Sequence, residues 1–236
     1  RDAQARLALD DLHEQYPATD TEALAPLARN KRIAGEWLER NRTDVPAITP
    51  AGAPAIPGLV LYRAPAPGEK CVIGADPAEG NPSSDDSAAT VLSAGAPRAE
   101  EVARLRGKFE PAVFGAHLDR IGSFFNRAGV MCERNNHGHA VLLWLRDHSR
   151  LERLLGHDGK EGWLSNSKGK SLLYDRAAEA FRDDMTELHS FDTFTQLASI
   201  EGATLRAPEG LNDDLADSYA LALVGATARR PEVRIR

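Results

Sequence analysis

Acidic residues stand at the ends of several apolar segments of this chain. Asp76 and Glu133 each close a short apolar run, and three more acids open the last helical segment: Asp213, Asp214 and Asp217. An acid at the end of a buried strand is held rigidly at the sheet edge, so acids from neighbouring elements can converge on one point. Hard divalent cations prefer oxygen ligands, and two ions about 4 Å apart can activate a water and stabilise the leaving oxygen of a phosphodiester. The acids therefore indicate metal-dependent phosphodiester hydrolysis.

Each acid also has a structural explanation when it is taken alone. Aspartate is common in the turn after a strand, and at a helix start it caps the helix and suits its dipole. Asn212 could serve as the cap of the last helix, however, and Asp213, Asp214 and Asp217 repel one another beside it. A bound cation explains this crowding, so we interpret the acids as one set.

Short strands and amphipathic helices must position these acids. Apolar runs bounded by turn residues predict strands at 71–76, 87–93, 101–106 and 129–133, of which the first three form a meander. Apolar residues at helical spacing predict helices at 111–128, 137–147, 171–184 and 212–228. This order of elements is typical of a mixed α/β sheet with helices on its faces.

The first 68 residues differ in character from the rest. The segment 1–42 has a helical pattern, and it is followed by a proline-dense stretch around the short run LVLY, which predicts an extended connector with one strand. We therefore expect two parts, a helical and proline-rich linker at 1–68 and a catalytic domain at 69–236.

Composition and charge narrow the functional classes. The chain is 42% hydrophobic and 27% charged, and no apolar run approaches the roughly 20 residues that span a bilayer. The N-terminal stretch lacks the order of a secretory signal, and it begins at Arg1, so we read the chain as part of a longer protein. Cys71 and Cys132 lie in apolar runs and suit a reducing cytoplasm. A net charge of −6 argues against a simple nucleic-acid-binding module but not against a nuclease, whose metal reverses the sign of its acidic site.

The segments that carry the acids resemble the three acidic motifs of the terminase large-subunit nucleases of tailed bacteriophages. In this chain the first motif corresponds to VIGADPAEG followed by DDSAATVL. The second corresponds to GVMCERNNHGHAVLLWLRD, and the third to NDDLADSYALAL. The segment EQYPATDTEAL resembles the link between the ATPase half and the nuclease half of these proteins. Three motifs in the same order are far more specific than any one of them.

The resemblance implies a ribonuclease H-like fold, a mixed β-sheet flanked by helices, in which 1–68 is the end of the ATPase half and its connector. It makes Asp76 and Glu133 the first two metal ligands and catalytic residues, and it places the third ligand on the Asp213–Asp214 pair, where we favour Asp214. Asp86 matches an auxiliary acid of the metal site. The chain departs from the family at Asn212, where a histidine is common, and Asp217 is an extra acid of open role.

The function implied is that of an endonuclease with Mg²⁺ or Mn²⁺, two ions in all, that cuts concatemeric double-stranded viral DNA during genome packaging. The terminase small subunit and the portal protein are the implied partners, and the location is the cytoplasm of the bacterial host. A junction resolvase or transposase of the same fold, or a catalytically silent DNA- or portal-docking module, remains an alternative. The linker segment favours a terminase.

Four cations are candidates for contact with the DNA backbone. The resemblance places Lys168 and Lys170 in a turn before a helix, and Arg134 and Arg146 stand within the second acidic motif. A solvated surface position explains the lysines equally well. His137 and His139 follow Glu133 closely, but two-metal hydrolysis needs no histidine.

Overall fold

The computed structural model describes residues 30–95 and 97–229. Its centre is a six-stranded mixed sheet in the order β1-β4-β3-β2-β5, with β6 pairing β4 beside β1. The strands are β1 (Leu59–Leu61), β2 (Cys71–Asp76), β3 (Ser87–Ser93), β4 (Ala99–Gly107), β5 (Gly129–Cys132) and β6 (Thr186–Glu187). The predicted mixed sheet and its meander are confirmed, since β2, β3 and β4 pair antiparallel in sequence order.

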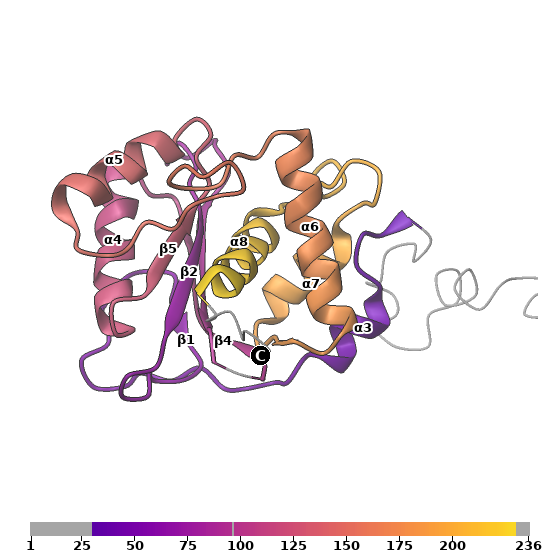
Figure 1. Ribbon diagram of the computed structural model, residues 1–236, viewed down its shortest axis with the longest axis horizontal. Helices are drawn as coiled ribbons and strands as arrows, with labels where there is room; N and C mark the ends of the chain where they lie inside the picture. The colour runs from indigo at the N-terminus through magenta and orange to yellow at the C-terminus, as the bar shows by residue number, and fades with distance from the viewer. Residues whose placement is uncertain (1–29, 96, 230–236) are drawn as a thin grey trace, which may run out of the picture.

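Helices cover both faces of the sheet, as Figure 1 shows. One face carries α4 (Pro111–Phe124) and α5 (Gly138–His148). The other carries α3 (Gly35–Arg40), α6 (Ser167–Arg182), α7 (Phe191–Ser199) and α8 (Asp214–Arg229). The buried apolar residues fall into two clusters, one on each face. Across the described residues, no helix combines the length and the apolar composition that a membrane crossing requires.

The central strands bring two of the acids to one edge of the sheet. Strand β5 pairs parallel with β2, and the Glu133 backbone N–H donates to the Ala75 carbonyl at 2.8 Å. Asp76 and Glu133 therefore leave the sheet at the same end. Cys71 and Cys132 are buried in these two strands.

Helix α8 lies directly on β2 because Gly74 has no side chain. A Cβ atom at Gly74 would lie 2.0 Å from the Ser218 carbonyl oxygen and 2.2 Å from the Ala222 nitrogen. Beside this contact, the buried hydroxyls of Thr90 and Ser218 are hydrogen-bonded at 2.9 Å. The close approach fixes the start of α8, and with it the third acidic motif, over the end of β2.

Gly74→Ala should lower the stability of the protein strongly. Overpacking a core typically costs about 1–3 kcal/mol, and we expect about 3 kcal/mol because the added methyl group meets backbone rather than a flexible side chain. Gly35→Ala is the matched control, since a Cβ atom there meets nothing within 4 Å. Thermal melts of both variants measure the effect. Equal melting temperatures would show that α8 can move away from β2 at little cost.

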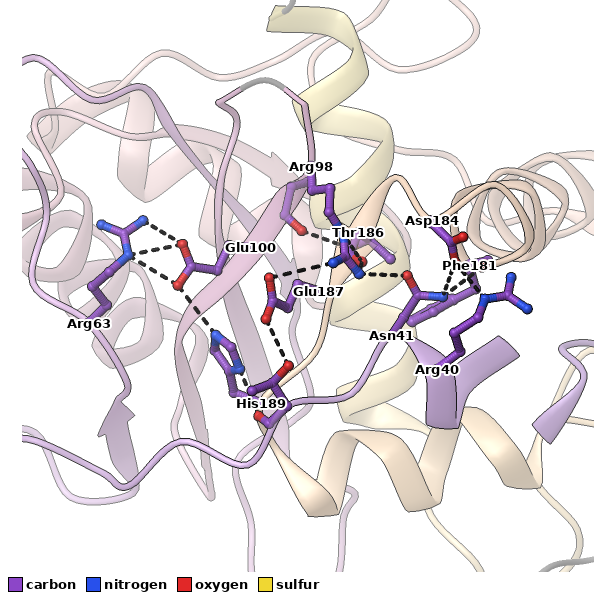
Figure 2. Close-up of polar contacts among 12 residues, drawn as sticks. Arg40, Asn41, Arg63, Arg98, Glu100, Phe181, Asp184, Thr186, Glu187 and His189 are labelled. Carbon is purple, nitrogen blue, oxygen red and sulfur yellow. Dashed lines mark hydrogen bonds and ion pairs between the residues drawn. The ribbon is translucent and has the colours of Figure 1, made fainter. Parts of the chain in front are cut away.

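The described part of the N-terminal linker is built into the same sheet and core. Strand β1 pairs with β4, and Ile33 and Leu38 are buried with the helices of one face. The Asn41 amide donates to the Phe181 carbonyl at 2.8 Å and accepts from Arg98 (Figure 2), which ties the end of α3 to α6 and to the residue before β4. The division of the chain at residue 68 stays a prediction, and most of the predicted N-terminal helical segment lies outside the described residues.

The remaining elements differ from expectation for local reasons. Helix α4 ends at Phe124 rather than 128, because Asn126 and Arg127 adopt φ values of 52° and 61°. The prediction that Lys168 and Lys170 lie in a turn was wrong. They lie in the first turn of α6, because the Asn166 side chain accepts the Gly169 N–H and starts the helix early. Strand β6 and helix α7 were not predicted.

Candidate metal centre

A cleft of about 530 Å³ opens where β2 and β5 end and α8 begins. The six acids that the sequence singles out all line it, although they come from four separate segments of the chain: Asp76, Asp86, Glu133, Asp213, Asp214 and Asp217. Glu79 and Asp85 lie there too. The fold therefore concentrates negative charge in one open cavity.

Asp76 and Glu133 lie next to each other in the lining of this cleft. Burial raises the pKa of Asp76 well above its ordinary value, and a hydrogen bond to Glu133 and the charge of Glu133 raise it further. The turn into α5 wraps closely around Glu133, because a Cβ atom at Gly138 would lie 1.7 Å from the Glu133 carbonyl oxygen. These two acids sit close enough to share a proton or a cation.

Asp214, the first residue of α8, is buried without a full set of partners. The residue is 4% exposed, and within the described residues its Oδ2 atom has no hydrogen-bond partner. Burial, together with the charge of Asp85, raises the pKa of Asp214 to about 7. A buried, unpartnered carboxylate oxygen is costly unless a ligand satisfies it, so this atom fits a bound cation.

Helix α7, which the sequence did not predict, fixes the position of Asp214. The Gln196 side chain on α7 accepts the backbone N–H of Leu215 at 2.7 Å, with a longer bond from Ala216. These N–H groups belong to the first turn of α8 and have no partner within the helix. Gln196 therefore holds the end of α8 that carries the third acidic motif.

Asp217 differs from Asp214 because both of its oxygens are engaged. Tyr174 donates its hydroxyl to Oδ1 at 2.5 Å, and the Lys170 ammonium lies 2.9 Å from Oδ2. The same ammonium is 4.0 Å from Oδ2 of Asp213. Burial raises the pKa of Asp217 to about 6, against the opposing charge of Lys170. Lys170 thus faces the acids rather than open solvent.

Asp86 also has its own cations. Arg106 lies 2.7 Å from Oδ2 and Lys108 lies 3.0 Å from Oδ1. Although burial favours the protonated form, the hydrogen bonds and charges of Lys108 and Arg106 hold the pKa of Asp86 below its ordinary value. Asp86 therefore lines the cleft with its charge already compensated by Arg106 and Lys108.

The predicted DNA-contacting cations lie in different surroundings. Lys168 is exposed on the first turn of α6. Arg134 is only 12% exposed and pairs with Asp158 at 2.5 Å. Arg146 is exposed on α5 and pairs with its neighbour Asp147. His137 lines the cleft, whereas His139 is exposed on α5 and is not among the lining residues.

Sequence reasoning missed Arg206, an exposed residue that lines the cleft. The Glu201 N–H donates to the Arg206 carbonyl at 3.0 Å, which closes a compact loop between α7 and α8. Nothing in the spacing of the surrounding residues marks Arg206. Only the folded loop brings it to the acids.

The cleft therefore has the donor set of a site for a hard divalent cation. Within the described residues, no three carboxylate, histidine or cysteine side chains already form a closed metal shell. A cation bound between Asp76 and Glu133 would take the place of the hydrogen bond between them. The buried free oxygen of Asp214 and the all-carboxylate lining fit Mg²⁺ or Mn²⁺.

The metal-free protein should lose stability as the pH rises toward neutrality. Asp214 has a pKa of about 7 in the folded chain against an ordinary 3.8, so between these values the folded chain holds a proton that the unfolded chain has released. Stability is then highest at the acidic end of this window. We expect the free energy of unfolding of the wild type to fall, relative to Asp214→Asn, from about pH 4 to about pH 7. Denaturant titrations in EDTA measure the difference, and a gap that is constant with pH would contradict it.

Comparisons with solved structures identify proteins that share the fold of this chain. No protein-family profile and no curated protein matches the chain. The solved large terminase nuclease from thermophilic phage G20c with bound magnesium matches with 17% identity and a TM-score of 0.62, over 84% of this chain and 98% of that one. Its cobalt-bound form has a TM-score of 0.63 with the same identity and coverage. The chain has the fold of a phage large-terminase nuclease.

Further structures with this terminase-nuclease fold agree. The large terminase nuclease domain of Thermus phage P74-26 matches with 17% identity and a TM-score of 0.61, over 82% of this chain and 94% of that one. The large terminase of bacteriophage HK97 matches with 10% identity and a TM-score of 0.53, over 83% of this chain but only 43% of its own length. The predicted ribonuclease H-like fold is thereby confirmed.

Proposed function

We propose that this chain is a metal-dependent endonuclease that cuts concatemeric double-stranded viral DNA during genome packaging. The observation that carries the proposal is the unpartnered, buried Oδ2 of Asp214 in a cleft that Asp76 and Glu133 also line. The terminase-nuclease fold supports the same function, and two of the similar structures hold magnesium and cobalt.

Asp76, Glu133 and Asp214 would hold the metal. Mg²⁺ or Mn²⁺ bound there supplies positive charge that polarises the phosphoryl oxygens and promotes deprotonation of the attacking water. We propose two such ions in the active complex, as the resemblance implies. Asp213 and Asp217, which flank Asp214 in the third acidic motif, could serve the second ion, whereas Asp86 is held by Arg106 and Lys108.

The chain's own side chains would bind and orient the DNA. Arg206 is exposed at the cleft, and a guanidinium can bind two phosphate oxygens at once. Lys168 is exposed at the start of α6, where it can approach the same backbone. These contacts reach phosphates rather than base edges, so the cleavage we propose has no strong sequence preference.

Nicking of supercoiled plasmid tests the proposal. We expect nicked and then linear DNA with Mg²⁺ or Mn²⁺, and no cleavage in EDTA. A chain that binds DNA but never cuts it, with either metal at several concentrations, would be a silent docking module instead. Cleavage confined to branched DNA would favour a junction resolvase of the same fold. The terminase small subunit, the portal protein and the cytoplasm of the bacterial host belong to the proposal as its implied setting.

DNA binding by the chain should be weak, salt-sensitive and tolerant of sequence. A net charge of −6 leaves few surplus cations, so affinity depends on local groups such as Lys168 and Arg206. Each phosphate contact contributes about −0.9 to the slope of log affinity against log salt. We expect Arg206→Ala and Lys168→Ala each to reduce that slope by about 1, and Arg182→Ala, at the far end of α6, to leave it unchanged.

Fluorescence anisotropy with random and single-site duplexes at several salt concentrations, in EDTA to prevent cutting, measures these slopes. Tight, sequence-selective and salt-insensitive binding would instead favour a resolvase-like or regulatory reader of DNA. A slope unchanged in Arg206→Ala would remove that residue from the interface.

A further inference from the structure

The acids of the cleft divide into two groups with different partners. Asp76, Glu133 and Asp214 form no ion pair within the described residues, and one buried oxygen of Asp214 has no partner. Asp217 and Asp213 form the second group, and the Lys170 ammonium lies 2.9 Å from one and 4.0 Å from the other. Of these five acids, Asp213 and Asp217 are therefore the two that have a cation in ion-pair contact within the described residues.

Helix α6 holds Lys170 in this position from two sides. Gly169 packs so closely that a Cβ atom would lie 1.9 Å from the Leu164 carbonyl oxygen, which fixes the first turn of the helix against the preceding loop. Tyr174 is four residues after Lys170 and therefore on the same helix face, and its hydroxyl binds the other oxygen of Asp217. The Lys170 side chain is only 17% exposed, and that of Asp217 is 13% exposed.

We propose that Lys170 is a built-in cation that occupies the position of a second metal ion. In the free protein the cleft then binds a single divalent ion, at Asp76, Glu133 and Asp214. Asp217 is a positioning residue for Lys170 and not a metal ligand in that state. This inference rests on the proposed function. It adds that the first ion binds in the free protein, whereas the position of the second is occupied by Lys170.

The electrostatics of the pair support this assignment. Two positive charges within a few ångströms repel each other strongly in a partly buried site, so an ion at Asp217 would have to displace the ammonium. Removing one partner of a buried ion pair leaves the other charge without compensation. Without Lys170, the unpaired Asp217 and Asp213 would therefore attract a cation from solution.

Titration of the metal-free chain with Mn²⁺ by calorimetry tests the inference. We expect one tightly bound ion per chain for the wild type and two for Lys170→Met, with the second ion bound at least about tenfold more tightly than any second ion in the wild type. Lys168→Met is the matched control, since it removes an exposed lysine from the same helical turn. Asp217→Asn should keep the tight ion within about threefold in affinity, whereas Asp214→Asn should lose it.

Two outcomes would overturn the inference and separate it from the proposed function. Two ions of similar affinity in the wild type would contradict the role of Lys170 and leave the nuclease proposal in place. No ion bound by any variant, with folding confirmed by thermal melts, would contradict both. Lys170→Gln, which keeps a hydrogen-bond donor without the charge, serves if Lys170→Met does not fold, and the wild-type stoichiometry is decisive without either variant.

Discussion

Asp76→Asn should abolish plasmid cleavage and leave the protein folded. The change removes one ligand charge at the end of β2 without changing the volume of the side chain. The side chain lies in the cleft beside Glu133, so we expect the substitution to weaken metal binding rather than the core. Losing several kcal/mol of charge stabilisation lowers the cleavage rate by roughly three orders of magnitude or more.

The measurement is the rate of nicking at several Mg²⁺ concentrations, with thermal melts to establish folding. Asp183→Asn is the control, because that aspartate is exposed at the end of α6 and away from the lining residues of the cleft. A nicking rate for Asp76→Asn equal to that of the control at every metal concentration would remove Asp76 from the catalytic set.

Divalent metal should raise the melting temperature of the wild type by several degrees, and less for Glu133→Ala. The ion binds only the folded cleft, and at a hundredfold excess over the dissociation constant it stabilises the folded state by about 2.7 kcal/mol. Without metal, Glu133→Ala should melt no lower than the wild type, because the substitution removes a charge that disfavours ionised Asp76.

Melts with Mg²⁺, Mn²⁺ and EDTA measure both parts of this expectation. Glu152→Ala controls for the loss of a glutamate outside the lining residues of the cleft. If the wild type melts at the same temperature with and without metal, its carboxylates do not converge on an ion.

Much of the sheet could be predicted because its strands are continuous apolar runs between turn residues. Strands β2 and β3 occupy the residues expected from sequence, and β5 ends one residue earlier, at Cys132. The positions of Asp76 and Glu133 followed directly, since a residue at the end of a predicted strand has a defined place at the sheet edge.

The sequence did not predict the contacts that depend on how helices pack. Lys170 was expected to reach DNA from a turn, but it lies on α6, which packs against α8, and its ammonium contacts Asp217. Asp86 was expected as an auxiliary metal ligand, and only the pairing of β3 with β4 shows that Arg106 lies beside it. Side-chain partners across elements are set by tertiary packing, which periodicity along the chain does not report.

Helix α7 could not be predicted from the sequence either. It is short, and the side-chain oxygen of its Gln196 accepts hydrogen bonds from two N–H groups at the start of α8. A single polar residue on a nine-residue helix carries no recognisable pattern in sequence. Its role depends on the first-turn N–H groups of α8, which have no acceptor within that helix.

Locating the ion in crystals soaked with Mn²⁺ tests most directly whether Asp76, Glu133 and Asp214 form a metal centre. We expect an anomalous peak within coordination distance of carboxylate oxygens from all three, including the Asp214 Oδ2 atom that is buried without a partner. A peak that lies only beside Asp86 would contradict the metal centre and with it the proposed nuclease. The absence of any peak in the cleft at a saturating Mn²⁺ concentration would contradict them too.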